Sequence, residues 1–295
     1  MSSSCLHNSE KSAVGLLAGW GRFPIIVADQ LKRSGHRVIC CGIKGHADES
    51  LISLCDEFRW FGMARMGSQL RFFKQNGVSQ ATMAGKIFKT LLLQKNSMFQ
   101  HFPDWKCIKH FYPVYFANNK DRKDDTMLRT VTELFGSGGV EFSPATDFAP
   151  ELLVSEGPLT DRLPGKKQLV DIQFAWKLAK EMGRLDVGQS VAVKGRAVLA
   201  VEAVEGTDEC IRRAGQLCKS SGFTVVKVAK PQQDMRFDVP TVGVSTLETM
   251  HKSGADVLAL EADKTIVLDQ EQFVKIANRL KIAVIACRDE SLNVV

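Results

Sequence analysis

Short apolar runs alternate with amphipathic stretches along the first half of the chain, and this alternation restricts the fold more than any other feature. It begins at Val14 with the strand-like run VGLLAGW, continues with the helix-like stretch FPIIVADQLKRSG and returns to the strand-like run RVICCGI. A strand, a helix and another strand in this order predict parallel strands joined by right-handed crossovers. The first half is therefore expected to be an α/β, Rossmann-like domain with a doubly wound parallel sheet.

The same alternation continues to about residue 145, and it sets the expected domain boundaries. Helix-like GSQLRFFKQNG, strand-like QATMAGKI, helix-like DDTMLRTVTELFGSG and the short run VEFSPA follow in turn. The segment between Pro144 and Pro164 contains further prolines and few helix signals, which is typical of a linker. We therefore expect a disordered N-terminus at residues 1–12, a Rossmann-like domain at residues 13–159 and a C-terminal catalytic domain at residues 160–295.

The second half mixes two kinds of connection. The helix-like stretch DIQFAWKLAKEMG is followed by the paired runs QSVAVKG and AVLAVEAV, which indicate a hairpin. Helix-like TDECIRRAGQLC, strand-like FTVVKVA, helix-like TLETMHKSG, two short strands in VLALEADKTIVL, helix-like EQFVKIANRL and strand-like AVIAC complete the chain. Because hairpins and crossovers both occur, this domain is expected to be α+β or α/β.

Composition narrows the class of protein. The 295 residues suffice for two domains, and 44% hydrophobic with 24% charged residues is typical of a soluble globular protein. No apolar run reaches the roughly 20 residues needed to span a bilayer, and the start lacks a secretory signal pattern, so we expect a cytoplasmic protein. The 8 cysteines and 6 histidines form no zinc-type spacing, and the net charge of +6 is spread along the chain, which disfavours nucleic-acid binding.

The segment KVAKPQQDMRFDVPTVG is the strongest candidate for chemistry, because it places mixed charges between two strand-like runs. Its cations Lys227, Lys230 and Arg236 could neutralise phosphate oxygens, whereas its carboxylates could hold a divalent metal ion or orient a water molecule. Asp238 is our first candidate for a catalytic acid residue, since Val239 and Pro240 restrict the chain beside it. The alternative is a solvated loop whose charges pair with one another.

Further candidates lie where strands lead into helices. Gly19 and Gly21, with Gly15 before them, could let backbone N–H groups approach an anion, or could serve only a tight turn. Lys86 follows a strand-like run and could reach a phosphate, although exposed lysines are common there. Asp125, next to Asp124 at a helix start, could bind metal or sugar or simply cap the helix. Glu205, Thr207 and Asp208 form a similar junction, where a cap or a phosphate site are the alternatives.

These segments, taken together, resemble the two-domain UDP-2,3-diacylglucosamine diphosphatases (pyrophosphatases) of lipid A biosynthesis, a family unrelated to the metallophosphoesterases that perform the same step. The resemblance is carried by GLLAGWGRFP, AGKI, KDDTMLR, EGPLTD, DIQFAWKLAKEMGRLDVGQSV, VLAVEAVEGTDE, KVAKPQQDMRFDVPTVG and LEADKTIVLD, which stand in family order from Val14 to Cys287. The first loop departs from the family pattern because Trp20 stands where the family often has glycine. The aromatic-rich stretch from Phe99 to Phe116 has no counterpart in the resemblance.

The resemblance implies a function and a set of roles. The expected reaction is Mg2+-dependent hydrolysis of UDP-2,3-diacylglucosamine to UMP and 2,3-diacylglucosamine 1-phosphate, with Asp238 as the catalytic residue and a metal ligand. Glu205 and Asp208 are the other expected metal neighbours. The substrate-binding candidates are Gly19, Gly21, Lys86, Asp125, Thr207, Lys230 and Arg236. A homodimer and peripheral contact with the inner face of the inner membrane are also implied.

Two other functions are compatible with parts of the sequence. A Rossmann-type oxidoreductase would carry an acidic residue after the second strand to bind ribose, but RVICCGIKG has Lys44 there. A non-catalytic module that binds a nucleotide sugar or a lipid would have no turnover to lose when Asp238 is replaced.

Overall fold

The computed structural model describes residues 12–87, 101–112, 124–220, 222–236 and 239–292, and the side chains of residues 124–126 are outside that description. Two compact units divide the chain, Met1–Ala149 and Pro150–Val295. We call them unit 1 and unit 2 and describe each by itself. The disorder expected for residues 1–12 concerns a segment that, apart from Ser12, lies outside the described residues.

Unit 1 is built on a five-stranded sheet in which every pair of neighbours is parallel. The strand order is β3-β2-β1-β4-β5. The strands are β1 (Ala13–Ala18), β2 (Arg37–Ile43), β3 (Glu57–Phe61), β4 (Gln80–Ala84) and β5 (Glu141–Phe142). This order places the first βα turn at the point where the chain changes direction across the sheet, next to β4.

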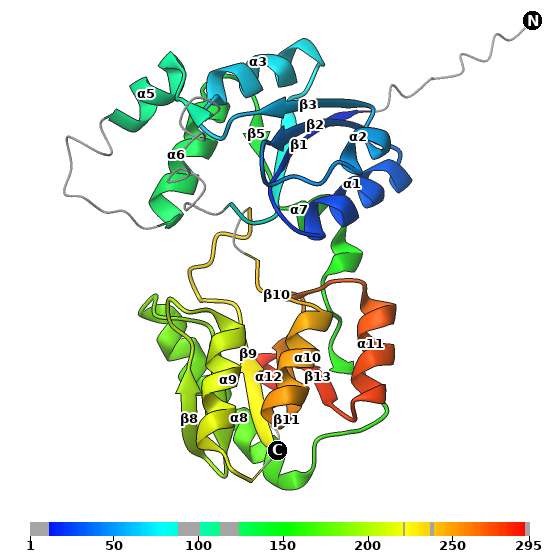
Figure 1. The fold of residues 1–295 in the computed structure, drawn as a ribbon, viewed down its shortest axis with the longest axis vertical. Helices are drawn as coiled ribbons and strands as arrows, with labels where there is room; N and C mark the ends of the chain where they lie inside the picture. Colours follow the sequence, from blue (N-terminus) through cyan, green and yellow to red (C-terminus); the bar gives the residue numbers. More distant parts are fainter. Residues whose placement is uncertain (1–11, 88–100, 113–123, 221, 237–238, 293–295) are drawn as a thin grey trace, which may run out of the picture. The chain divides into compact units, whose positions relative to one another are not determined.

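Helices lie on both faces of this sheet (Figure 1). The helices are α1 (Phe23–Arg33), α2 (Leu51–Leu54), α3 (Met66–Gln75), α5 (Trp105–Tyr112), α6 (Asp124–Gly136) and α7 (Ala145–Phe148). Buried side chains of α3, α5 and α6 form one core with β1, β2 and β4, whereas α1 packs against the sheet through Val27, Ala28 and Leu31. The expectation of a doubly wound parallel sheet is confirmed.

The edge strand β3 and the short helix α2 were not foreseen. In β3 the sequence EFRWF carries Glu57 and Arg59, and only Phe61 of its five residues is buried. An edge strand has one solvated side, so charged residues are tolerated there and weaken its sequence signal. The periodicity of the sequence therefore did not predict β3, the strand at one edge of the sheet.

Unit 2 contains a six-stranded mixed sheet in the order β6-β13-β11-β9-β7-β8. Strands β9, β11 and β13 are parallel, whereas β6, β7 and β8 pair in antiparallel fashion. The strands are β6 (Gly157–Pro158), β7 (Ser190–Lys194), β8 (Ala197–Val201), β9 (Phe223–Lys227), β11 (Ala255–Glu261) and β13 (Ala283–Cys287), with β10 (Thr241–Val242) and β12 (Ile266–Val267) in a separate parallel pair. The mixture of hairpin and crossover connections is confirmed.

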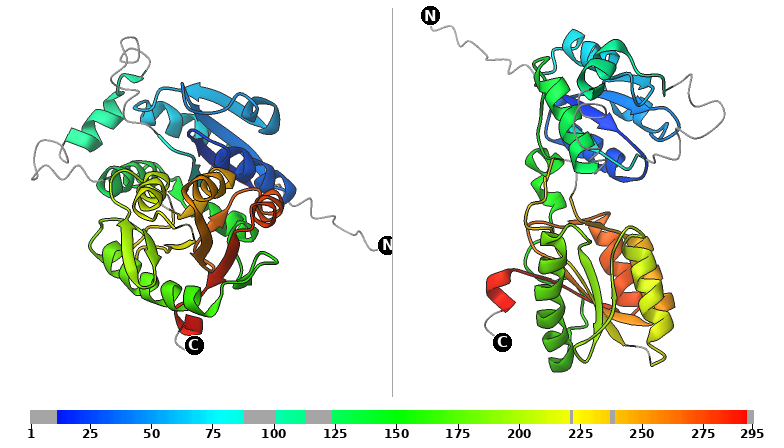
Figure 2. Two further views of the ribbon diagram at one scale, coloured as in Figure 1. Left: turned by 60° about the horizontal axis from the view of Figure 1, so that its bottom comes forward. Right: turned by 90° about the vertical axis from the view of Figure 1, so that its left-hand side faces the viewer.

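Helices cover both faces of the larger sheet, as the right-hand view of Figure 2 shows for α8 on one side. The helices are α8 (Lys166–Arg184), α9 (Thr207–Leu217), α10 (Val244–Ser253), α11 (Gln270–Arg279) and α12 (Asp289–Leu292). Successive side chains of a strand point to opposite faces of the sheet. In β9, Val226 packs with α8 on one face, and Val225 packs with the core of α9, α10 and α11 on the other. None of the helices among the described residues is long and apolar enough to cross a membrane.

The segment between Pro144 and Pro164, expected to be a linker, is structured. It contains α7, a 3-10 helix at Pro150–Leu152 and strand β6, whose residues pair with β13. The backbone N–H of Leu159 also donates to the carbonyl oxygen of Val284 at 2.9 Å. Prolines are compatible with an edge strand. Residues 150–159, which we expected in the first domain, therefore belong to unit 2.

Candidate functional site

The polar residues of unit 2 converge at the carboxyl ends of its parallel strands. Lys227 ends β9 and pairs in register with Leu260 of β11, one residue before Glu261. The antiparallel strand β7 begins beside them, with Ser190 opposite Lys227. The carboxyl edge of a parallel sheet is where open α/β folds place their ligands. We call this region the β9 edge.

A buried lysine lies at the centre of the β9 edge. Lys227 is 6% exposed, and its ammonium group donates a hydrogen bond to Thr207 Oγ1 at 2.8 Å. The Thr207 hydroxyl in turn donates to Glu202 Oε1 at 2.9 Å, and Ser190 Oγ lies 3.4 Å from Thr207 Oγ1. A buried charge is tolerated only with such partners. Thr207, predicted as a substrate-binding residue, is thus the link between a buried cation and a buried carboxylate.

The charged loop after β9 contains the two predicted phosphate-binding cations, and each is paired with an acid. Lys230 Nζ lies 2.7 Å from Asp186 Oδ1, and its backbone N–H donates to Gln233 Oε1 at 2.7 Å. Arg236 donates from Nε and Nη2 to the two carboxylate oxygens of Asp234, at 2.9 and 2.6 Å. Asp238, the predicted catalytic residue, lies outside the described residues.

A buried carboxylate of β11 fixes this loop to the sheet. Glu261 is 3% exposed and accepts hydrogen bonds from Lys180 Nζ at 2.7 and 2.6 Å. It also accepts from the backbone N–H of Ala229 at 2.7 Å and from Lys264 Nζ at 2.9 Å. Glu261 therefore links helix α8 to the first residues of the loop, which limits the freedom of the chain that carries Lys230.

Several buried polar atoms at the β9 edge have hydrogen-bonding capacity left over. Among the described residues these atoms are Gln189 Oε1, Glu202 Oε2 and Gln233 Nε2. Buried polar groups are nearly always hydrogen-bonded in folded proteins. Three such atoms in the segments around one sheet edge suit a polar ligand.

Sequence reasoning missed Glu202 and Glu261 as members of the site, and it included Lys227 among the cations of the charged segment without predicting its burial. The two glutamates carried a usable signal, because each stands at the end of a strand-like apolar run, in VLAVEAV and VLALEAD. A carboxylate in such a position is buried when the strand is, and buried carboxylates need cationic or hydrogen-bonded partners. Lys180 could not be assigned to Glu261 from the sequence, since the pair joins distant segments.

Two carboxylates predicted as metal neighbours, Glu205 and Asp208, stand close to the start of α9 in the chain. Among the described residues no group of three or more His, Cys, Asp or Glu side chains is placed to hold a metal ion. Glu205 is paired with Arg213, and a backbone hydrogen bond within its own residue, together with that guanidinium, lowers the pKa of its carboxyl group. Asp208 lies in the first turn of α9. The predicted Mg2+ site stays a prediction, and Asp238 lies outside the described residues.

The acidic residues of α9 also bear on phosphate binding. Asp208 and Glu209 stand in its first turn, where they stabilise the helix dipole and oppose an approaching anion. Helix α10 begins after Gly243 without an acidic residue in its first turn. The start of α10, which follows the charged loop in the chain, is therefore more favourable for a phosphate than the start of α9.

In unit 1 the structure brings Gly19 close to Lys86. The N–H of Gly19 donates to Ala84 O at 2.8 Å, and Trp20 forms an antiparallel bridge with Lys86 through bonds of 2.8 and 2.9 Å. A Cβ atom on Gly19 would lie 2.7 Å from Lys86 O, so this glycine permits a close backbone contact. The N–H of Gly19 is thereby occupied, whereas Gly21 has φ +105° and open space around it.

The remaining candidate, Asp125, lies in the first turn of α6, but its side chain is outside the described residues. Lys86 is exposed at the end of the β4 segment, as the sequence led us to expect. Binding of substrate by Gly19, Gly21, Lys86 and Asp125 stays a prediction.

Comparison with known families covers both units. The family model of the LpxI N-terminal domain matches residues 13–152, and that of the LpxI C-terminal domain matches residues 155–285. The chain belongs to the LpxI family. A curated LpxI protein from Caulobacter vibrioides, named UDP-2,3-diacylglucosamine pyrophosphatase, is 29% identical over 285 residues, which is 92% of this chain and 96% of that protein. The LpxI domains correspond closely to units 1 and 2.

Proposed function

We propose that this LpxI protein hydrolyses the diphosphate bond of UDP-2,3-diacylglucosamine, a step of lipid A biosynthesis, and releases UMP and 2,3-diacylglucosamine 1-phosphate. One structural observation carries the proposal. The β9 edge combines the buried cation Lys227 with unfilled polar atoms and a loop rich in cations, and these suit a charged diphosphate. The name and 29% identity of the Caulobacter relative support the choice of substrate.

Water is added across the anhydride bond in this reaction. The oxygen of water bonds to one phosphorus atom, the bond from that phosphorus to the bridging oxygen breaks, and the bridging oxygen leaves with the other phosphate. Negative charge grows on that leaving oxygen, so a fixed cation in a site that excludes water stabilises the transition state. Lys227 is suited to this role because Thr207 and Glu202 hold it in place before substrate binds.

Lys230 and Arg236 serve as the outer phosphate contacts in this proposal. Each has an acidic partner, Asp186 and Asp234 respectively, that keeps its side chain in a defined position. A diphosphate would compete with these carboxylates for the cations. Exchanging one anionic partner for another costs little free energy, because both ion pairs are partly solvated. Asp238 follows Arg236 closely in the chain, and we propose it as the metal ligand or as the base that orients the attacking water.

Mg2+ remains part of the proposal, with Asp238 as its ligand. Mg2+ in proteins commonly keeps several waters and binds one or two carboxylates together with substrate phosphates. When bound, it would neutralise the diphosphate. The described residues do not bring three or more candidate metal ligands together. The support for Mg2+ therefore comes from the family resemblance. We also propose that the protein is a cytoplasmic homodimer, and sedimentation velocity of the purified protein tests the dimer.

The experiment is release of UMP from UDP-2,3-diacylglucosamine by purified protein, with Mg2+ or with EDTA, for wild type and for Asp238→Ala. Asp29→Ala is the matched control, since Asp29 is paired with Arg33 on the surface of α1. We expect metal-dependent release that collapses in Asp238→Ala and persists in the control. Release unaffected by Asp238→Ala would remove this residue from its role. No release by the wild type with any divalent metal would contradict the reaction and favour a binding module.

A further inference from the structure

Helix α5 of unit 1 presents a row of large apolar side chains to solvent. Trp105 is 77% exposed, Ile108 37% and Tyr112 60%, and spacings of three and four residues put them on one side of the helix. Phe102, just before the helix, is 58% exposed. Scattered exposed apolar residues are ordinary, but a contiguous row of them on a single helix marks an interaction surface.

The opposite side of α5 anchors it to the core, so the exposed row is held in a fixed position. Cys107 and Phe111 are buried in the core that α3 and α6 share. Asp104 caps the helix, because its Oδ1 accepts a hydrogen bond from the N–H of Cys107 at 3.0 Å and its Oδ2 accepts one from the N–H of Ser68 at 3.0 Å. The cap therefore joins the start of α5 to the start of α3.

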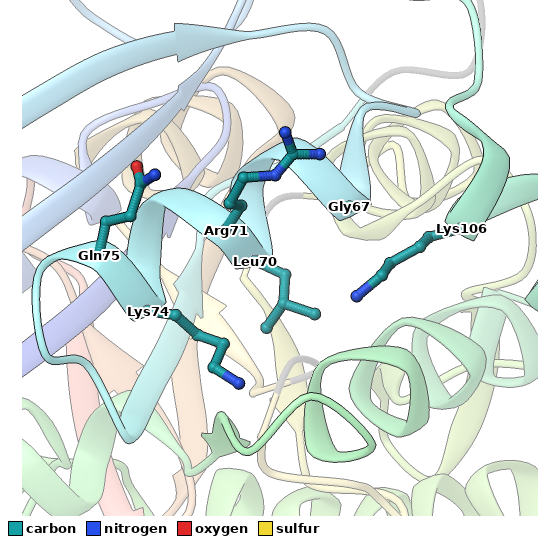
Figure 3. Close-up of a pocket in the computed structure, with 6 residues that line it drawn as sticks. All are labelled: Gly67, Leu70, Arg71, Lys74, Gln75 and Lys106. Atoms are coloured by element: carbon teal, nitrogen blue, oxygen red, sulfur yellow. The ribbon is translucent and has the colours of Figure 1, made fainter.

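Positive charges lie on α5 itself and on the helix α3 that contacts it. Lys106 and Lys109 project from α5, and Arg71 and Lys74 project from the neighbouring α3. Lys106, Arg71 and Lys74 also line a shallow pocket of about 350 Å³ whose apolar wall is Leu70. Figure 3 shows the ammonium ends of Lys74 and Lys106 on either side of the Leu70 side chain. Neither helix contains an acidic residue, and the nearby Asp104 is used in capping.

We propose that this surface, formed by Phe102, Trp105, Ile108 and Tyr112 together with Lys106, Lys109, Arg71 and Lys74, binds the surface of a membrane containing anionic phospholipid. We call it the α5 face. Aromatic side chains that end in polar groups favour the interface between headgroups and acyl chains, and lysines beside them attract anionic headgroups. The inference goes beyond the proposed function, since binding to lipid vesicles requires no hydrolysis.

Charge favours a membrane over a second copy of the chain as the occupant. Two α5 faces brought together would oppose four cations on each side, and like charges brought together at an interface repel one another. A membrane with anionic headgroups supplies the complementary charge and also accepts the aromatic rings. A protein whose proposed substrate carries two acyl chains gains access to that substrate by resting on the bilayer.

Co-sedimentation of the full-length protein with phosphatidylcholine vesicles, with and without 30% phosphatidylglycerol, tests the proposal. We expect wild type to bind the anionic vesicles and to be released by high salt. Trp105→Ser with Tyr112→Ser, and separately Lys106→Glu with Lys109→Glu, should each weaken binding by roughly tenfold or more. The buried anchors Cys107 and Phe111 are retained in both variants, and circular dichroism checks that α5 still forms.

Two control variants match these changes on unit 2. Leu163→Ser with Leu217→Ser removes two exposed apolar residues, and Lys252→Glu with Lys275→Glu reverses two exposed charges. The controls should bind vesicles as wild type does. The proposal is overturned if wild type does not bind anionic vesicles, or if the controls lose as much binding as the α5 variants. It is equally overturned if the α5 variants bind normally and instead change the oligomeric state, because the face would then be an interface between copies.

Discussion

Gly85 shows how a single residue fixes the first βα turn of unit 1. Its φ is +92°, and a Cβ atom there would lie 2.7 Å from Pro24 Cγ and 2.8 Å from both Gly19 C and Trp20 O. No side chain can be added without moving the backbone that joins the β1 turn to Lys86. The close contacts with Pro24, Gly19 and Trp20 therefore account for this glycine.

We predict that Gly85→Ala lowers the free energy of unfolding by about 2 kcal/mol or more, because left-handed strain and a backbone clash add together. Denaturant unfolding measures the effect. Gly77→Ala is the control, since Gly77 also has positive φ, at +75°, but has no atom within 4 Å of the added Cβ. A loss for Gly85→Ala no larger than that for Gly77→Ala would show that the close contact is unimportant.

A second prediction at the residue scale concerns the buried carboxylate of Glu261. Lys180→Met removes the cation that contacts both of its oxygens and leaves Lys264 and the N–H of Ala229. Removing one partner of a buried ion pair typically lowers the free energy of unfolding by about 3 kcal/mol or more. We expect a loss of that order in the free energy of unfolding, measured by denaturant titration. The exposed Lys177 on the same helix is the control, and an equal loss for Lys177→Met would argue against the buried pair.

Among the elements, α1, β2 and the segment before β3 are joined through Asp56. Its carboxylate accepts a hydrogen bond from Lys32 Nζ of α1 at 2.7 Å and one from the N–H of Val38 in β2 at 2.8 Å. Partial burial acts to raise the pKa of Asp56, but these donors outweigh it and the pKa is lowered. The contact therefore stabilises the fold only while Asp56 is ionised.

A lowered folded-state pKa means that this stabilisation is complete above the unfolded value near pH 4 and is lost as the pH falls through the folded value. We predict that Asp56→Asn costs about 1 kcal/mol of unfolding free energy at pH 7 and much less at pH 3. Denaturant titrations of both proteins at the two pH values measure the difference. An equal cost at both would show that the ionised form is not what stabilises the contact.

The alternation of strand-like and helix-like segments predicted most elements of both sheets, because buried parallel strands read as continuous apolar runs. It failed at β3, where edge exposure admits Glu57 and Arg59, and at β6, where two residues with a proline carry no periodicity. Elements that are short or half-solvated are specified by their neighbours in space. Their identity therefore could not be predicted from local sequence.

The candidate site was predicted in part. The charged loop after β9 lies at a sheet edge as expected, but its cations Lys230 and Arg236 are paired with acids. Lys227 was visible as a charge in an apolar run, yet its links to Thr207 and Glu202 join three separate segments. Contacts of this kind depend on strand order and register, which the sequence pattern did not specify.

On the scale of the whole molecule, the two units divide the roles. Unit 2 carries the β9 edge, and unit 1 carries the glycine turn with Lys86 and the α5 face. We infer that chemistry belongs to unit 2 and that unit 1 contributes substrate contacts and attachment to lipid. The central claim is that Lys227 at the β9 edge acts on the diphosphate.

Turnover of UDP-2,3-diacylglucosamine to UMP by Lys227→Met tests that claim most directly. We predict that kcat falls by about 100-fold or more, because the fixed cation that stabilises the developing charge is lost. Lys227→Arg should recover part of the activity, Lys252→Met is the exposed control, and thermal unfolding checks that each variant is folded. A folded Lys227→Met protein with the kcat of the wild type would contradict the account.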